Sequence, residues 1–373
     1  MQKGFEVTPY EVKGSVNYEK LVREFGITPL DEEMLERIKN LAKGDLHFLL
    51  RRKIFFAHRD LKWILDEYEK GSEFYVYTGI APSGNMTIGH LIPFLLAKWL
   101  QDRFGAEVYI QIPDEEKALI RDKGFDEIHK LAYEDALDIA ALGFDPKKTK
   151  MFINTEYAGT LYKYAVRIAK YITFSMIKDA FGFTNQNNIG SIFYTSMQAV
   201  PAMLKSAQEG KNIPCLIPLG VDQDVHFRIS RDVLPKLGYY KPAILHAKFL
   251  PGLNGSQKMS ASDPRNTVYL SDSADEIRKK VMNAFTGQQA TAELQRKYGG
   301  NPEVCAVCQY NKFLFEPNDE KLEEIFEGER SGSLLAGEHK EDLAKKVVRF
   351  VEEHKKAKER VKDKLDEFIL RDC

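Results

Sequence analysis

The feature that most constrains the fold is a regular alternation of short apolar runs with longer helical patterns between Glu73 and about Thr286. The apolar runs are rich in β-branched and aromatic residues, which predicts buried strands. Strands that are joined through helices form a parallel sheet covered on both faces. The sequence therefore predicts an α/β fold, a Rossmann-like doubly wound parallel sheet. Its strands read FYVYTG (74–79), AEVYIQIP (106–113), KMFIN (150–154), PCLIPLG (214–220) and AILHAKFLPG (243–252).

The loops that follow these strands are polar, and several contain glycine. In doubly wound sheets, ligands bind outside the carboxyl ends of the strands, where the strand order reverses. We therefore expect the chemistry to lie in these loops, which read TGIAPSGNMTIGH (78–90), QIPDEEK (111–117), LGVDQD (219–224) and LPGLNGSQKMSAS (250–262).

The first of these loops places Gly89 and His90 directly before a helical run from about Leu91 to Phe104. Pro93 lacks a backbone donor and is tolerated only in the first turn of a helix, so the helix begins within one turn before it. Free backbone N–H groups and the helix dipole favour an anion at such a helix start, and glycine permits close approach. Either a nucleotide binds there, or the glycines only form a turn and His90 caps the helix.

Three regions follow from the pattern along the chain. Residues 1–72 are polar with helical spacing and predict an N-terminal helical extension. Residues 73–286 form the predicted Rossmann-fold catalytic domain. Residues 287–373 are charged and helical without strand signals, which predicts a C-terminal helical domain.

Composition places the chain among ordinary globular proteins, with 43% hydrophobic and 29% charged residues in 373. The formal net charge of −1 means that contact with a nucleic acid requires a local basic patch. No segment resembles a signal peptide or a membrane span, so we expect a cytoplasmic protein without membrane contact.

The cysteines, Cys215, Cys305, Cys308 and Cys373, predict reduced thiols. The Cys305–Cys308 pair has half of the ligands that a tetrahedral zinc site needs, and no second CxxC or HxxxH lies nearby in the sequence. We therefore expect no metal site in the chain and no stoichiometric zinc in the purified protein.

Two of the loops carry segments that are similar to the signatures of class I aminoacyl-tRNA synthetases. TIGH, Thr87 to His90, resembles their HIGH signature, and KMSAS, Lys258 to Ser262, resembles their KMSKS signature. With FFAHRD, FYVYTG, HLIPFLLAKWLQ, FGFT, VDQD and KMSASDP, the resemblance is to the archaeal and eukaryotic branch of the tryptophanyl-tRNA synthetases, over roughly Arg51 to Phe315. It implies activation of tryptophan with ATP and transfer to tRNA(Trp).

The resemblance also implies roles for the signature residues. His90 donates a hydrogen bond to the ATP phosphates, and Lys258 places an ammonium group on the leaving pyrophosphate. Ser260 and Ser262 add donors, and Gly252 and Gly255 let the loop close over ATP. Thr87, Gly89 and Met259 complete the ATP site, with Mg2+ on the phosphates.

One position departs from the pattern of the family, where an arginine is expected at Ile80. One cationic contact to the ATP phosphates is then either missing or supplied elsewhere. Lys117 and Arg121 are candidates, although a solvated surface position is the favoured reading for both.

For the amino acid, the resemblance implies that Tyr77 and Gln111 accept or orient the indole N–H. Glu116, Gln198 and Gln223 would hold the substrate ammonium group. An indole offers one donor in an apolar ring, so a buried acceptor can select it. Any one glutamine taken alone is more often a surface or structural residue.

The segment HKKAKERVKDKLDEF, from His354 to Phe368, gives a local basic face on a near-neutral chain. Charge alone favours a solvated, salt-bridged helix. The resemblance instead implies a helical domain that binds the anticodon region of tRNA, in a homodimer.

Three alternatives stay open at this point. A tyrosyl-tRNA synthetase shares the fold and both signatures. A small-molecule adenylyltransferase shares the chemistry of the helix start but does not explain KMSAS. A catalytically silent synthetase-like protein that binds tRNA is suggested by Ile80 and Thr87.

Overall fold

A computed structural model describes residues 6–7, 12–13, 17–120 and 123–372. Within these residues a seven-stranded sheet has the order β3-β4-β9-β8-β5-β6-β7. Its parallel strands confirm the predicted α/β fold: β5 (Tyr75–Gly79), β6 (Val108–Ile112), β7 (Thr149–Ile153), β8 (Cys215–Gly220) and β9 (Ala243–Ala247).

The chain runs outward from β5 through β6 to β7 and then returns to the other side of β5 as β8 and β9. The strand order therefore reverses between β5 and β8. This is the position where a doubly wound sheet leaves a crevice at the carboxyl ends of its strands.

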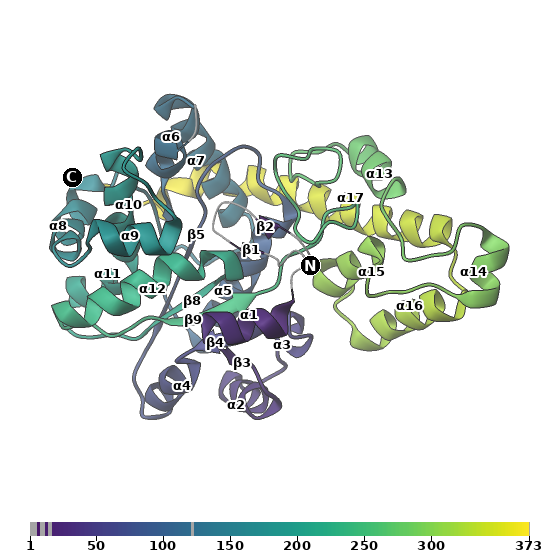
Figure 1. Cartoon of the computed structure of the whole chain (residues 1–373), viewed down its shortest axis with the longest axis horizontal. Helices are drawn as coiled ribbons and strands as arrows, with labels where there is room; N and C mark the ends of the chain where they lie inside the picture. The colour runs from purple at the N-terminus through teal and green to yellow at the C-terminus, as the bar shows by residue number, and fades with distance from the viewer. Residues whose placement is uncertain (1–5, 8–11, 14–16, 121–122, 373) are drawn as a thin grey trace.

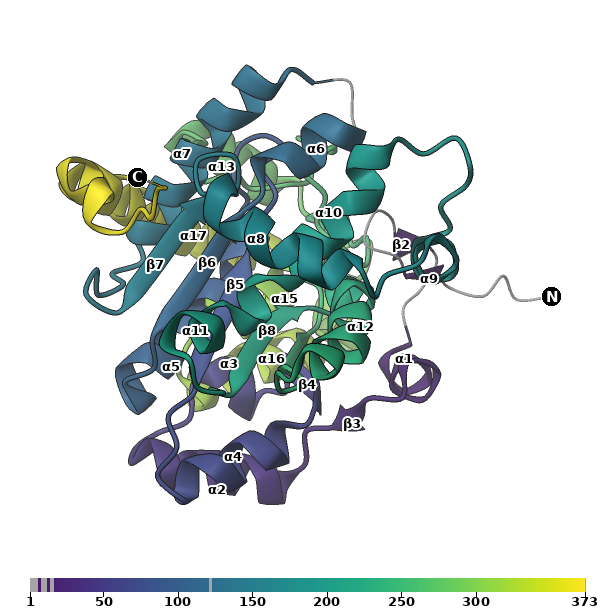
Figure 2. The ribbon, with the colours of Figure 1, turned by 90° about the vertical axis from the view of Figure 1, so that its left-hand side faces the viewer.

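The residues of each strand alternate between two hydrophobic cores, which explains why the sheet carries helices on both faces. Val76 and Ile110 belong to one core, whereas Tyr77 and Tyr109 belong to the other. The first core is covered by α2 (Glu32–Ala42), α4 (Leu61–Glu69), α5 (Leu91–Phe104) and α7 (Phe125–Ala140); the second by α8 (Ala158–Ala169), α10 (Ile189–Ala199), α11 (Pro201–Glu209) and α12 (Asp224–Val233) (Figure 2).

The predicted N-terminal helical extension, residues 1–72, contains helices in its described part, but it also contributes strands that were not predicted. Two strands of this region, β3 (Thr28–Pro29) and β4 (Phe55–Arg59), extend the sheet, and β4 pairs antiparallel with β9. The run Phe55 to Ala57 is buried on both faces, and periodicity cannot separate such a strand from a buried helix. Two short paired strands, β1 (Glu6–Val7) and β2 (Val12–Lys13), precede α1 (Tyr18–Phe25), and α3 (Phe48–Arg51) precedes β4.

Beyond the sheet the chain is helical, as predicted for residues 287–373. These helices form a lobe on the right of Figure 1: α14 (Ala292–Tyr298), α15 (Ala306–Tyr310), α16 (Asp319–Ser331) and the first part of α17 (Ala336–Val361). Helix α17 packs against α13 (Ala274–Met282) and reaches back to α7, and Ile369 then bridges to Met151 in β7. The lobe and the sheet are thus joined by one long helix. Two further helices belong to the segments that connect the strands: α6 (Asp114–Ile120) follows β6, and α9 (Phe174–Phe181) lies between β7 and β8 in the chain.

No helix in the described part of the chain has the length and apolar character that a membrane crossing requires.

Candidate active site

A cleft of about 400 Å3 lies at the carboxyl ends of β5, β6 and β8. The candidate residues come from the four polar loops, from Tyr77 in β5 and from Gln198 in α10, and the fold brings all of them into the wall of this one cleft. They are Tyr77, Thr87, Gly89, His90, Gln111, Glu116, Gln198, Gln223, Lys258, Met259, Ser260 and Ser262.

The two signature segments lie against each other. Residues Ile88–His90 form a short 3-10 turn that leads directly into α5, so His90 stands at the helix start as predicted. The backbone N–H of Ile88 donates to the carbonyl of Val268 at 3.1 Å, which ties this turn to the chain that follows KMSAS. A methyl group added at Gly89 would lie 3.5 Å from the Met259 sulfur. The segment before α5 and the KMSAS loop therefore form one wall of the cleft.

The His90 ring is held by the backbone of its own turn. The N–H of Thr87 donates to His90 Nδ1 at 3.2 Å, so the proton of the neutral ring resides on Nε2. Burial and the nearby Lys258 charge lower the pKa of His90 to about 4. The side chain of His90 makes no capping bond to α5; it closes the 3-10 turn before the helix, and the residue also lines the cleft. His90 is thus a neutral ring with one N–H left to donate.

The ammonium group of Lys258 is held by an ion pair in this conformation. Its Nζ lies 2.6 Å from Asp222 Oδ2 and 5.0 Å from the centre of the Phe249 ring. In the same loop, the hydroxyl oxygens of Ser260 and Ser262 are 2.8 Å apart and both residues are exposed. Gly255 has a φ of +79°, a conformation that favours glycine, at the base of the loop.

A buried acceptor pair lies at the ends of β5 and β6. The Tyr77 hydroxyl donates to Gln111 Oε1 at 2.5 Å, and both residues are about 1% exposed. Gln111 Nε2 donates to Asn154 Oδ1 at 3.1 Å, which directs the amide oxygen of Gln111 toward Tyr77. The Tyr77 oxygen also accepts from Gln198 Nε2 at 3.1 Å. The oxygens of Tyr77 and Gln111 can therefore accept a hydrogen bond from one donor group of a ligand.

A carboxylate group lies beside this pair. Burial raises the pKa of Glu116, but the charge of Lys117 and the hydrogen bonds from Lys117 and Tyr194 outweigh it and bring the pKa below its ordinary value. Lys117 Nζ is 2.7 Å from Glu116 Oε1, and the Tyr194 hydroxyl donates to Oε2 at 2.9 Å. Gln198 Oε1 lies against the same Tyr194 hydroxyl, so the two acceptors share its single proton. Glu116 is therefore ionised, and in this conformation Lys117 balances its charge.

The sequence did not single out three of the positioning residues. Asn154 follows strand β7, Tyr194 lies one helical turn before Gln198, and Asp222 stands beside Gln223. Their positions are the signal that could have identified them. Asn154 directly follows a strand, Tyr194 shares a helix face with Gln198, and Asp222 lies in the VDQD segment.

The structure shows where Ile80 lies, the residue that stands where the family pattern has an arginine. Ile80 lines the cleft, and so does Lys117. The favoured reading of Lys117 as a solvated residue is wrong, because its side chain is only 17% exposed and lines the cleft. Arg121 lies outside the described residues.

The family described as tRNA synthetases class I (W and Y) matches residues 69–352. The tryptophan–tRNA ligase of Sulfolobus acidocaldarius is 46% identical over 99% of this chain and 96% of its own length. That of Saccharolobus solfataricus is 48% identical over 97% of this chain and 94% of its own.

Solved structures agree over nearly the whole fold. The tryptophanyl-tRNA synthetase of Encephalitozoon cuniculi bound to tryptophan superposes with a TM-score of 0.89 at 36% identity, over 95% of this chain and 98% of that one. The Plasmodium falciparum tryptophanyl-tRNA synthetase gives 0.89 at 37% identity, over 95% and 97% of the two chains.

Proposed function

The chain belongs to the class I tRNA synthetases, in the family of the tryptophan–tRNA ligases, and from this premise we propose that it activates L-tryptophan with ATP and transfers it to tRNA(Trp). The tryptophan carboxylate attacks the α-phosphorus of ATP, the bond to the bridging oxygen breaks and pyrophosphate leaves. A hydroxyl of the terminal ribose of the tRNA then attacks the adenylate carbonyl, and AMP leaves.

The observation that carries this proposal is the buried acceptor pair Tyr77–Gln111 in the same cleft as both signature segments. An indole N–H can donate to either oxygen, because each has a lone pair beyond its existing bonds. Asn154 fixes the orientation of Gln111 through its own side chain. A ring without an N–H could not form this additional hydrogen bond, which gives a basis for selection.

The ammonium group of the substrate meets a negative site in this arrangement. Glu116 supplies the charge, and Gln198 and Gln223 supply amide oxygens on the same cleft wall. The contacts of the Tyr194 hydroxyl with Glu116 and Gln198 hold these groups before the substrate arrives. Preorganised polar groups lose little entropy on binding.

At the phosphates, no protein nucleophile is required, because the substrate carboxylate is already ionised. His90 donates its Nε2–H to the phosphate oxygens, and Lys258 balances the charge that develops on pyrophosphate. Lys258 must leave Asp222 to do so, which couples its action to closure of the KMSAS loop. ATP is expected as its Mg2+ complex, so that the ion arrives with the substrate.

The remaining expectations concern assembly and location. We place tRNA binding on the C-terminal helices and expect a cytoplasmic homodimer. Part of the basic face of α17 is already paired, since Lys358 Nζ lies 2.9 Å from Glu134 and 3.1 Å from Asp138 on α7. Gel filtration with light scattering measures the oligomeric state, and aminoacylation of tRNA transcripts tests the tRNA partner.

Tryptophan-dependent ATP–pyrophosphate exchange tests the proposal directly. We expect exchange with tryptophan and none without an amino acid. Exchange with a different small acid would support an adenylyltransferase, and tRNA binding without exchange would support the catalytically silent alternative.

A further inference from the structure

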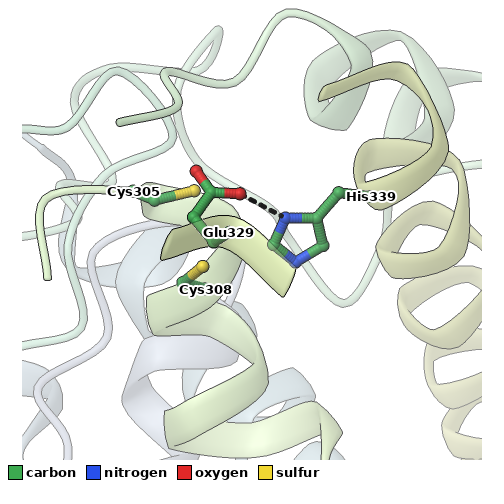
Figure 3. Close-up of side chains that lie close together, drawn as sticks. All are labelled: Cys305, Cys308, Glu329 and His339. Carbon is green, nitrogen blue, oxygen red and sulfur yellow. Dashed lines mark ion pairs between the residues drawn. The ribbon is translucent and has the colours of Figure 1, made fainter. Parts of the chain in front are cut away.

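Four side chains meet in the C-terminal lobe, as Figure 3 shows, and none of them lines the cleft. Cys305 and Cys308 flank the start of α15, Glu329 lies near the end of α16, and His339 lies in the first turn of α17. One potential ligand atom from each lies within 4.8 Å of all the others. We refer to Cys305, Cys308, Glu329 and His339 as the cysteine cluster.

All four residues of this cluster are buried, and several of their polar atoms lack a hydrogen-bond partner in the described part of the chain. The two cysteines and Glu329 are 0% exposed, and His339 is 1% exposed. Glu329 Oε1 and both ring nitrogens of His339 make no hydrogen bond among the described residues. The contact from His339 Nδ1 to Glu329 Oε2 measures 3.4 Å, so it leaves Oε1 and Nε2 unsatisfied. Buried polar groups in native proteins are almost always paired, and such exceptions call for an unseen partner.

The geometry points to a metal ion as that partner, and we propose that the cysteine cluster binds one divalent transition metal ion, with zinc as the preferred occupant. Two thiolates, an imidazole and a carboxylate are ligands that zinc accepts, and four protein ligands make a closed structural site. Ligands of a tetrahedral zinc ion lie roughly 3.3–3.8 Å from one another, so small side-chain rotations would close the cluster around it.

The surroundings of the cluster support this assignment. Gln288 Nε2 donates to Glu329 Oε2 at 2.7 Å, as expected of an outer residue that orients a ligating carboxylate. A redox-active thiol pair fits less well, because both cysteines are fully buried and no reductant could reach them. An iron–sulfur cluster also fits less well, since it is usually held by four thiolates and this site offers two.

The expectation of a protein without zinc rested on the lack of partner ligands near Cys305 and Cys308 in the sequence. The fold contradicts that premise, because it brings Glu329 and His339 from two other helices. A bound ion would link α15, α16 and α17, of which α15 has only 5 residues. We therefore expect the ion to stabilise the lobe.

Metal content of the full-length protein tests the proposal. The protein is purified without a histidine tag or chelator and is analysed by inductively coupled plasma mass spectrometry. We expect about one zinc per chain in the unmodified protein and in Cys215→Ala, a matched control at a buried cysteine in β8 outside the cluster. Cys308→Ala should retain less than about a tenth of that amount.

Two further measurements keep the test decisive if Cys308→Ala folds poorly. Glu329→Gln preserves the shape of the side chain and should lower the affinity for zinc about tenfold or more in a competition with a chromophoric chelator. Cobalt(II) added to the chelator-treated unmodified protein should give thiolate charge-transfer absorption and strong tetrahedral ligand-field bands.

Absence of zinc from the purified protein, together with no cobalt spectrum after reconstitution, would overturn the proposal. Equal metal content in the unmodified protein and in both cluster variants would also overturn it, because the ion would then lie elsewhere. Iron with acid-labile sulfide in place of zinc would overturn the assignment of a single ion.

Discussion

In the cleft, polar side chains satisfy one another, whereas in the cysteine cluster several buried polar atoms lack a hydrogen-bond partner among the residues that the structure describes. Tyr77, Gln111 and Asn154 form a continuous hydrogen-bonded chain, and Lys258 is paired with Asp222. Glu329 and His339 leave buried atoms unbonded. A site for exchanging substrates must be stable when empty, but a permanently filled structural site need not be. The difference is what we expect between an active site and a closed metal site.

The amino acid selected by the cleft provides the largest test of this comparison. We expect tryptophan to be preferred over tyrosine by about a thousandfold or more in kcat/KM for exchange. A phenol hydroxyl would be badly paired beside Tyr77 and Gln111, and the smaller ring would leave volume unfilled, each worth on the order of a few kcal/mol. Comparable rates, or a preference for tyrosine, would reassign the enzyme as a tyrosyl-tRNA synthetase.

The second test concerns the charge on the KMSAS loop. Lys258→Ala should lower the rate of exchange by about tenfold or more and leave tryptophan binding nearly intact, because the ammonium group acts mainly as pyrophosphate charge develops. Exchange kinetics and calorimetric titration with tryptophan measure the two quantities. Gln257→Ala is the control, since Gln257 is exposed in the same loop and does not line the cleft. An unchanged rate in Lys258→Ala would remove this lysine from the mechanism.

The sequence predicted most of the cleft because sheet topology brings the carboxyl ends of parallel strands together. Gln111 lies near the end of β6, where it pairs with β7, Glu116 follows β6, and Gln223 follows β8, so their convergence needed only the strand assignments. The strand β4 was missed because a run of consecutive apolar residues has no periodicity that distinguishes strand from helix.

The cysteine cluster could not be predicted in the same way. Glu329 and His339 are separated from Cys308 by 21 and 31 positions and lie on different helices. Nothing in the local pattern fixes how α15, α16 and α17 pack, so the sequence showed half of a ligand set. Spacing rules identify metal sites only when the ligands recur within one or two turns or hairpins.

The third test concerns how the acceptor pair recognises the ring. Gln111→Ala should reduce the preference for tryptophan over an analogue without the ring N–H, by several-fold to about tenfold, because a net hydrogen bond contributes about 1 kcal/mol. Exchange kinetics with both compounds measure the ratio. An unchanged ratio would show that Gln111 does not accept a hydrogen bond from the indole N–H, and Tyr77 would then be the acceptor.

The smallest effect on the exchange rate is expected from substitutions in the cysteine cluster, which is connected to the KMSAS loop through main-chain hydrogen bonds. The N–H of Ala306, next to Cys305, donates to the Phe285 carbonyl at 3.1 Å, and the Phe285 N–H donates to Leu253 at the base of the KMSAS loop at 2.6 Å. These bonds involve main-chain groups that no side-chain substitution in the cluster removes.

If the cluster only ties helices together, Cys308→Ala should lower the melting temperature clearly, yet reduce tryptophan-dependent exchange at 25 °C by no more than about threefold. Differential scanning fluorimetry and exchange kinetics on the same preparation measure both effects. The paired control is Lys258→Ala, for which we expect the reverse pattern, a large loss of rate and little change in melting temperature. Folded Cys308→Ala could instead lose as much rate as Lys258→Ala. The cysteine cluster and the cleft would then not be functionally independent, because the lobe would be positioning the loop that carries Lys258.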